Sequence, residues 1–297
     1  MLSAITIVAS LGMRETHKRT LLERRAKKRG LKVAGDSKIS TVRGFQTLLR
    51  DAMRRPLFLL ATEPIVSFLS LYIGFNFAVL YGFFASLQLV FQEVYGFQPH
   101  ETGLTFLSLA IGATLATATC LIMDKLIYQK KHQQLTKQGV KKVPPEYRLY
   151  PAMVGSIGVL VSLFWFAWTA RRGISWAAPV VALIPFNWGN LCIFTSAAIF
   201  LLDCYGPKYG ASSIAANGFV RYLFAMAFPL FIIPSEPPSS SVPPDCQTNV
   251  PVYNNLTSKW ATSLLGFISL VLTPTPWVLF AWGPKLRSWS RLAVSLE

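Results

Sequence analysis

The sequence of 297 residues is 52% hydrophobic and only 14% charged, with a mean hydropathy of +0.42 and a formal net charge of +16. This composition excludes an ordinary soluble globular domain and indicates a membrane protein that crosses the bilayer several times. A high positive charge can indicate nucleic-acid binding. Here the lysines and arginines lie between apolar runs and form no stripe, so we expect no nucleic-acid partner.

The chain begins with a short apolar run, residues 1–12, which is followed by a basic stretch. About 20 residues are needed to span a bilayer, and the basic start of a signal peptide is missing. We therefore predict that residues 1–12 are the remnant of a preceding transmembrane helix; a disordered or weakly interfacial N-terminus is the alternative. Residues 13–55 carry 14 lysines and arginines and are predicted to be a cytoplasmic segment that touches anionic lipid headgroups.

Six apolar stretches follow, and each contains at least 21 residues. At about 1.5 Å per residue, each is long enough to cross a hydrocarbon core of about 30 Å. The predicted spans are 65–91, 103–123, 150–170, 174–202, 211–233 and 260–282. The sequence thus predicts an all-α membrane protein with a six-helix transmembrane bundle over residues 56–284.

The distribution of lysine and arginine predicts how this bundle is oriented. Of the 29 basic residues, 25 lie in segments on one side of the spans, three lie on the other side, and Arg221 lies within a span. Because cytoplasmic loops carry the excess of Lys and Arg, both ends of the six-helix unit, including the tail 285–297, are predicted to be cytoplasmic. The Pro- and Ser-rich loop 234–257 is then external, and its composition predicts disorder.

Polar side chains within the predicted spans form the candidate substrate pathway. A lone guanidinium at membrane depth is costly, which favours a functional role for Arg221. Asn217 lies four residues earlier and therefore on the same helical face. Amides also form hydrogen bonds between membrane helices, so a structural role is the alternative. The candidate pathway residues are Asn76, Tyr81, Gln88, Asn187, Asn190, Asn217 and Arg221.

The sequence predicts no catalytic, cofactor or metal site. All three histidines lie outside the apolar runs, and the four cysteines show no C-x-x-C spacing. A rhomboid protease would need a Gly-x-Ser-Gly nucleophile and a histidine within a span. A mitochondrial carrier would need a threefold repeat with a proline followed by an acidic and a basic residue. The chain has neither pattern, so we expect no enzyme and no cofactor.

Several motifs resemble the second half of fungal major facilitator transporters of the twelve-span drug:proton antiporter type, which includes polyamine and multidrug-resistance transporters. These motifs are Pro145-Glu146-Tyr147-Arg148-Leu149, Phe164-Trp165-Phe166, Ser212 to Asn217 with Arg221, Phe228-Pro229, and Trp260 to Phe267.

The resemblance implies half of a major facilitator fold, namely helices seven to twelve, in a multi-pass protein of the plasma membrane. It also implies proton-coupled export of drugs or small amphipathic molecules by alternating access between two six-helix halves. The expected partners are a small-molecule substrate, protons, the lipid bilayer and an N-terminal six-helix half.

The chain departs from this family in three ways. The first six helices are absent, which predicts a truncated half. Relatives often carry a carboxylate in helix seven near Ala85, and this chain does not. Residues 232–250 have no counterpart, and our hypothesis is a retained intron, which transcript reads across the stretch would test. The alternative function is therefore a membrane protein fragment or scaffold without transport activity of its own.

Overall fold

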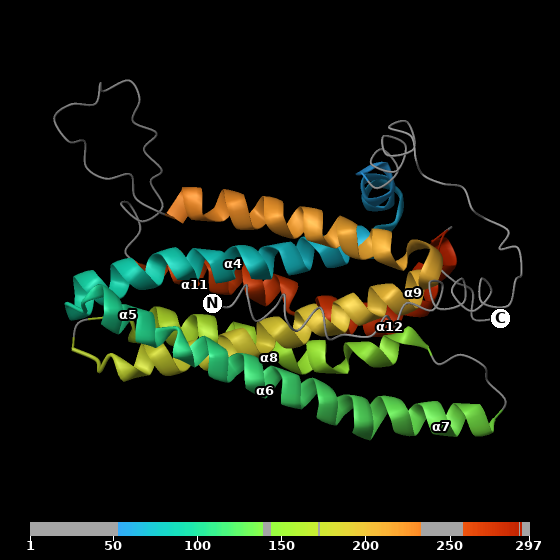
Figure 1. The fold of residues 1–297 in the computed structure, drawn as a ribbon, viewed down its shortest axis with the longest axis horizontal. Coiled ribbons are helices and arrows are strands. Elements are labelled where there is room, and N and C mark those ends of the chain that lie inside the picture. Colours follow the sequence, from blue (N-terminus) through green and yellow to red (C-terminus); the bar gives the residue numbers. More distant parts are fainter. Residues whose placement is uncertain (1–52, 139–143, 172, 233–257, 291, 293–297) are drawn as a thin grey trace, which may run out of the picture. The chain divides into compact units, whose positions relative to one another are not determined.

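The computed structural model describes residues 53–138, 144–171, 173–232, 258–290 and 292. Within these ranges all regular structure is helical, which confirms the predicted all-α class (Figure 1). Residues 1–12, nearly all of the basic segment 13–55, and the predicted external loop 234–257 lie outside the described residues.

The helices follow the apolar runs, but some are longer or more broken than predicted. A helix at 53–62 comes first. The elements after it are α4 (Pro64–Tyr95), α5 (Pro99–Thr105), α6 (Leu107–Met123), the π-helix η1 (Asp124–Tyr128), α7 (Gln129–Lys137), the 3₁₀-helix η2 (Pro145–Leu149), α8 (Tyr150–Thr169), α9 (Ala177–Ile232), α11 (Ser258–Leu272) and α12 (Thr275–Trp289).

Five helical runs in the described residues are long and apolar enough to cross a membrane: Pro64–Phe84, Pro99–Lys137, Pro145–Thr169, Ala177–Pro207 and Leu265–Trp289. The predicted span 211–233 corresponds to the second half of α9, which is helical to Ile232 but is not among these five. The predicted span 260–282 is interrupted between α11 and α12, where Pro274 caps the second helix.

Helix α9 reverses direction at Gly206, where the backbone has φ 59° and ψ −166°. Glycine tolerates this positive φ, and the following Pro207 disfavours helical geometry at the residue before it. Phe194 in the first half of α9 and Arg221 in the second half both contact the ring of Phe77 in α4. Both halves therefore contact α4, which brings residues 27 positions apart in sequence together; in Figure 1 the two halves extend from a junction at one end of the bundle.

Glycines allow the helices around the first half of α9 to pack closely. A Cβ atom on Gly155 of α8 would lie 2.8 Å from the carbonyl oxygen of Gly189, and one on Gly112 of α6 would lie 2.6 Å from that of Ile184. Close backbone contact of this kind is typical of membrane helices, which gain association energy from packing. Phe83 of α4 fills the neighbouring core, with its ring centre 5.0 Å from that of Phe166.

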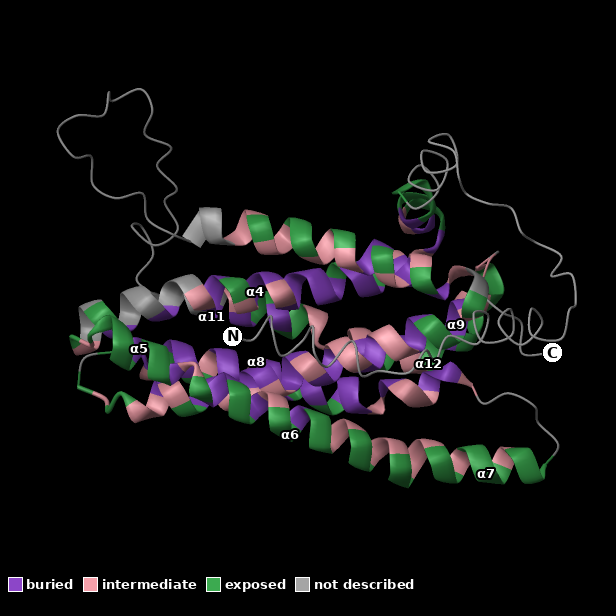
Figure 2. Ribbon diagram, in the orientation of Figure 1, coloured by how far each residue is buried: buried purple, intermediate pink, exposed green. Residues whose placement is uncertain are grey.

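Helix α6 continues without a break through η1 into α7, so this helical run ends 14 residues beyond the predicted end of the span. The sequence between Asp124 and Lys137 contains neither proline nor glycine, and nothing in it terminates a helix. Helix α7 has no buried residue and carries three lysines, and Figure 2 shows it as exposed residues with some of intermediate burial between them. It is a polar extension of an apolar helix.

The C-terminal end of α4 is joined to the C-terminal end of α8 through Tyr95. Its hydroxyl group donates to the carbonyl oxygens of Thr169 and Arg171, at 3.4 and 3.3 Å. Burial raises the pKa of the Tyr95 phenol, and the hydrogen bond to Arg171 opposes this only in part. Tyr95 therefore remains a neutral hydrogen-bond donor throughout the physiological pH range.

Candidate substrate pathway

Arg221 lies among three aromatic rings contributed by α4 and by both halves of α9. The guanidinium carbon is 4.8 Å from the ring centres of Phe77, Phe194 and Tyr222. Such distances allow cation–π attraction, which strengthens when the charge is removed from water. One terminal nitrogen of the guanidinium also donates to the Tyr222 hydroxyl group at 3.1 Å. The cation is thus held by π faces and by one neutral acceptor.

Two of the predicted pathway asparagines meet next to this aromatic group. The side-chain amide of Asn190 donates to the backbone carbonyl of Asn76 at 3.4 Å, and the amide of Asn76 donates to the carbonyl of Tyr72 at 2.8 Å. Asn76 precedes Phe77 in sequence, and Asn190 lies one turn before Phe194. Both asparagines are at most 2% exposed, and the side-chain oxygen of Asn190 has no hydrogen-bond partner among the described residues.

Asn217 lies one turn before Arg221 and is 4% exposed. Its amide nitrogen is buried and has no hydrogen-bond partner within the described part of the chain, and the same holds for Nε of Arg221. Burying a donor without a partner costs the full free energy of its desolvation, because no hydrogen bond replaces those to water. The helical face that Asn217 and Arg221 are predicted to share therefore carries two N–H donors without a hydrogen-bond partner in the described residues.

The remaining predicted residues lie elsewhere. Asn187 turns toward α6, where its amide donates to the carbonyl of Leu109 at 2.6 Å. Tyr81 is partly exposed, and its ring packs edge-on against Phe84. Gln88 belongs to α4, but its side chain is outside the described residues. The structure thus brings Asn76 and Asn190 together beside the rings around Arg221, and directs Asn187 to another contact.

We predict that Asn187→Ala destabilises the protein by about 1 kcal/mol, the order of an interhelical hydrogen bond in a membrane, and leaves ligand binding unchanged. The reason is that the amide joins α9 to α6 through its hydrogen bond to Leu109. Thermal unfolding in detergent would measure the loss. An unchanged melting temperature together with weakened ligand binding would contradict this structural role and place Asn187 in the pathway.

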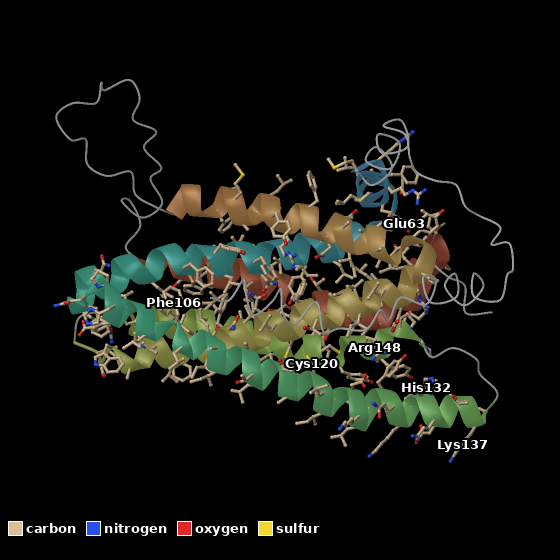
Figure 3. All side chains as sticks on the ribbon, in the orientation of Figure 1. Glu63, Phe106, Cys120, His132, Lys137 and Arg148 are labelled. Atoms are coloured by element: carbon tan, nitrogen blue, oxygen red, sulfur yellow. The ribbon has the colours of Figure 1, made fainter. Side chains whose placement is uncertain are left out.

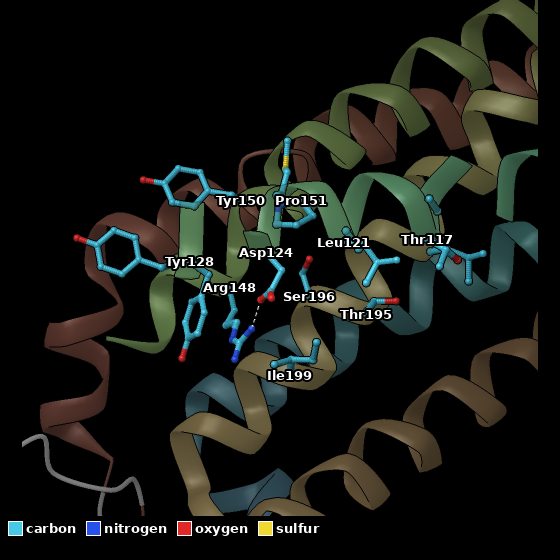
Figure 4. A pocket seen from close by; sticks show the side chains of 15 residues that line it. Thr117, Leu121, Asp124, Tyr128, Arg148, Tyr150, Pro151, Thr195, Ser196 and Ile199 are labelled. Carbon is cyan, nitrogen blue, oxygen red and sulfur yellow. Dashed lines mark hydrogen bonds and ion pairs between the residues drawn. The ribbon is translucent and has the colours of Figure 1, made fainter. Parts of the chain in front are cut away.

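A cavity of about 430 Å³ opens between α6, η1, η2, α8 and the first half of α9. Figure 4 shows Asp124, Arg148 and Tyr128 at one side of it, with Thr195 and Ser196 on α9. The guanidinium of Arg148 forms ion pairs with Asp124 and with Asp203, the latter at 3.1 Å, and lies 3.4 Å from the ring centre of Tyr128. The charges at this cavity thus already satisfy one another.

Two buried carboxylates, those of Glu63 and Glu146, lie with their partners at the end of the bundle that contains Glu63, which we call the Glu63 end. Glu63 accepts hydrogen bonds from the hydroxyl groups of Tyr205, at 3.1 Å, and Ser290. Glu146 pairs with Arg287 at 2.8 Å, and both side chains are less than 10% exposed. In Figure 3, Glu63, Arg148 and Lys137 all lie toward this end, whereas Phe106 lies toward the other.

Sequence reasoning did not predict these pairs, because their members are far apart in the chain. Arg148 and Asp203 are 55 residues apart, and Tyr205 and Glu63 are 142 apart. The sequence did contain one signal: single carboxylates next to span ends. Burying a carboxylate there is costly unless it has a partner. No group of three or more His, Cys, Asp or Glu side chains that could hold a metal ion occurs in the described ranges.

Comparison with known proteins connects this geometry with transport. Residues 1–229 match the family model described as Major Facilitator Superfamily. The chain is 34% identical to Polyamine transporter 4 of Saccharomyces cerevisiae, covering 93% of this chain and 43% of the relative. It is 33% identical to Efflux pump atB of Aspergillus terreus (96% and 57%) and 32% identical to MFS-type efflux pump MFS2 of Trichophyton rubrum (97% and 46%).

The chain therefore spans about half the length of these curated relatives. No solved structure matches it.

Proposed function

The chain belongs to the Major Facilitator Superfamily, and we propose that it acts as the second half of a transporter that exports small amphipathic molecules in exchange for protons. Two of the similar proteins are named efflux pumps, which supports export. The resemblance to drug:proton antiporters supports proton exchange. The chain itself is an integral multi-pass membrane protein, with apolar helices that can cross a bilayer.

The observation that carries this proposal is the arrangement around Arg221. The rings of Phe77 and Phe194, from different helical segments, converge on the guanidinium, and Asn217 and Arg221 carry buried donors that have no partner in the described residues. Binding sites of transporters typically combine apolar and aromatic walls with a few converging polar groups. Asn76, Asn190, Asn217 and Arg221 form the centre of the proposed pathway. Tyr81 and Gln88 extend it, whereas Asn187, predicted from the sequence as part of it, has the structural role proposed above.

The proposed orientation places the Glu63 end in the cytoplasm, and the proposed location is the plasma membrane. The lysines of η1 and α7, and Lys285 and Arg287 of α12, lie at or beyond the Glu63 end, whereas Arg171 follows α8 at the other end. This asymmetry follows the rule that cytoplasmic segments carry the excess of Lys and Arg.

We expect the chain to export its substrate when an N-terminal six-helix half is coexpressed with it, and Arg221→Ala to reduce the efflux rate at least tenfold. The substitution removes the guanidinium that lies among the rings of Phe77 and Phe194. The measurement is efflux of a fluorescent drug from yeast cells that lack their own pumps, with and without a proton gradient. Arg171→Ala is the matched control, because Arg171 is exposed at the far end of the bundle.

The alternative to transport is the one that we drew from the sequence. On this alternative the polypeptide is a membrane fragment or scaffold without transport activity. Absence of efflux, both alone and with an N-terminal half, would support this alternative and reject transport by this polypeptide.

A further inference from the structure

The donors around Arg221 exceed the acceptors available to them. Nε of Arg221 and the amide nitrogen of Asn217 are both buried and without partners in the described residues. The guanidinium has one hydrogen-bond acceptor there, the neutral hydroxyl group of Tyr222. The aromatic rings supply π density but no lone pair that could accept these N–H groups in a normal hydrogen bond.

The acidic groups that the structure describes are used elsewhere. At the Glu63 end, Glu63 accepts from Tyr205 and Ser290, Glu146 pairs with Arg287, and Asp124 and Asp203 pair with Arg148. At the opposite end, the carboxylate of Glu101 accepts the backbone N–H of Gln98 at the start of α5. Among described side chains, Arg221 therefore has no anionic partner, although a cation at this depth would be stabilised by one.

An incoming ligand can reach this cation from one side. Tyr222, which accepts from Arg221, is 62% exposed, and Phe219 on the neighbouring turn is 44% exposed. The rings of Phe77 and Phe194 cover two other sides of the guanidinium. A group that enters beside Tyr222 would meet N–H donors first, with aromatic walls around it.

We propose that Arg221 and Asn217 bind an anionic group of the transported molecule, so that the substrates of this chain are amphipathic organic anions. This inference rests on the proposed transport function and adds the substrate class. A planar guanidinium and an amide N–H match the lone pairs of a carboxylate or sulfonate, and hydrogen bonds to a charged acceptor are about twice as strong as neutral ones. The apolar part of the substrate would lie against the rings of Phe77 and Phe194.

The same charge disfavours cationic substrates. A protonated amine placed beside Arg221 would face a like charge without any described acid to offset it. The expected class therefore differs from the polyamines in the name of the Saccharomyces cerevisiae relative. Charge selectivity is the property that separates this proposal from simple hydrophobic binding.

The test is direct binding of three dansyl probes that differ only in their polar end: dansylglycine, its methyl ester and dansylcadaverine. The full chain is reconstituted in nanodiscs of neutral phosphatidylcholine, and energy transfer from its tryptophans reports binding. We expect dansylglycine to bind at least tenfold more tightly than the ester, which in turn binds more tightly than the amine. Arg221→Gln should abolish this order, Arg221→Lys should retain part of it, and Arg171→Gln should leave it intact.

Equal affinity for the three probes, or no change in Arg221→Gln, would overturn the proposal. Displacement of dansylglycine by phosphatidylserine in the nanodisc would assign the site to a lipid headgroup and also overturn it. Because binding is measured without transport, the proposed substrate class and the proposed transport function can be rejected independently of each other. Efflux without charge preference rejects the substrate class alone, and charge-selective binding without efflux rejects transport by this polypeptide alone.

Discussion

Substitution of Gly189 by leucine is expected to abolish recovery of the folded protein. A Cβ atom at this position would overlap the carbonyl oxygen of Gly155 and lie 2.9 Å from the side chain of Val159. The obstacle is backbone, which cannot rotate away as a side chain can, so α8 and α9 would have to separate. Overpacking a close contact typically costs about 1–3 kcal/mol of stability. For a leucine placed between two backbones we expect a larger cost than this.

Size-exclusion chromatography of a fluorescent-protein fusion would measure this loss as disappearance of the monodisperse peak. Gly189→Ala should give a weaker form of the same defect, with a lowered melting temperature. Gly218→Ala is the matched control, since it also lies in α9 but, among the described residues, its Cβ would have only Tyr222 nearby, at 3.8 Å. Wild-type behaviour of the leucine variant would show that α8 and α9 do not pack through these glycines.

The helical membrane class could be read from the sequence, because long apolar runs with few charges have one stable solution in lipid. Backbone groups must be satisfied within the segment, and helices achieve this. The turn between 202 and 211 could also be located, since Gly206-Pro207 is a local signal. The extension of α6 to Lys137 was not predicted, because hydropathy marks where a span ends and not where a helix ends.

The candidate site could be predicted only in part, for a related reason. The shared face of Asn217 and Arg221 follows from helical periodicity, which is local. The rings of Phe77 and Phe194 that surround Arg221 come from other segments, and one sequence does not reveal which residues meet across helices. Asn187 and Asn190 illustrate the limit. They are three residues apart in one helix, yet one contacts α6 and the other α4.

The ion pair between Glu146 and Arg287 provides the second large expected effect. The two side chains are 6% and 9% exposed, and their charged atoms lie 2.8 Å apart. The approach depends on Gly283 of α12, where a Cβ atom would lie 2.8 Å from Cγ of Glu146. Neither carboxylate oxygen accepts a hydrogen bond from the described residues, so the attraction is ionic and Arg287 is what compensates the buried negative charge.

Arg287→Met is therefore expected to destabilise the protein by about 3–5 kcal/mol, because it leaves Glu146 buried without its counter-charge. Lys285→Met is the control: Lys285 is exposed on the same helix, and its loss should change stability by less than about 0.5 kcal/mol. The double variant Glu146→Gln with Arg287→Met should recover most of the loss, since it removes the unpaired charge together with its partner. Equilibrium unfolding of the three variants in detergent measures this recovery. If the double variant were as unstable as Arg287→Met alone, the role of Arg287 would be packing between α12 and η2, and charge would not be what joins them.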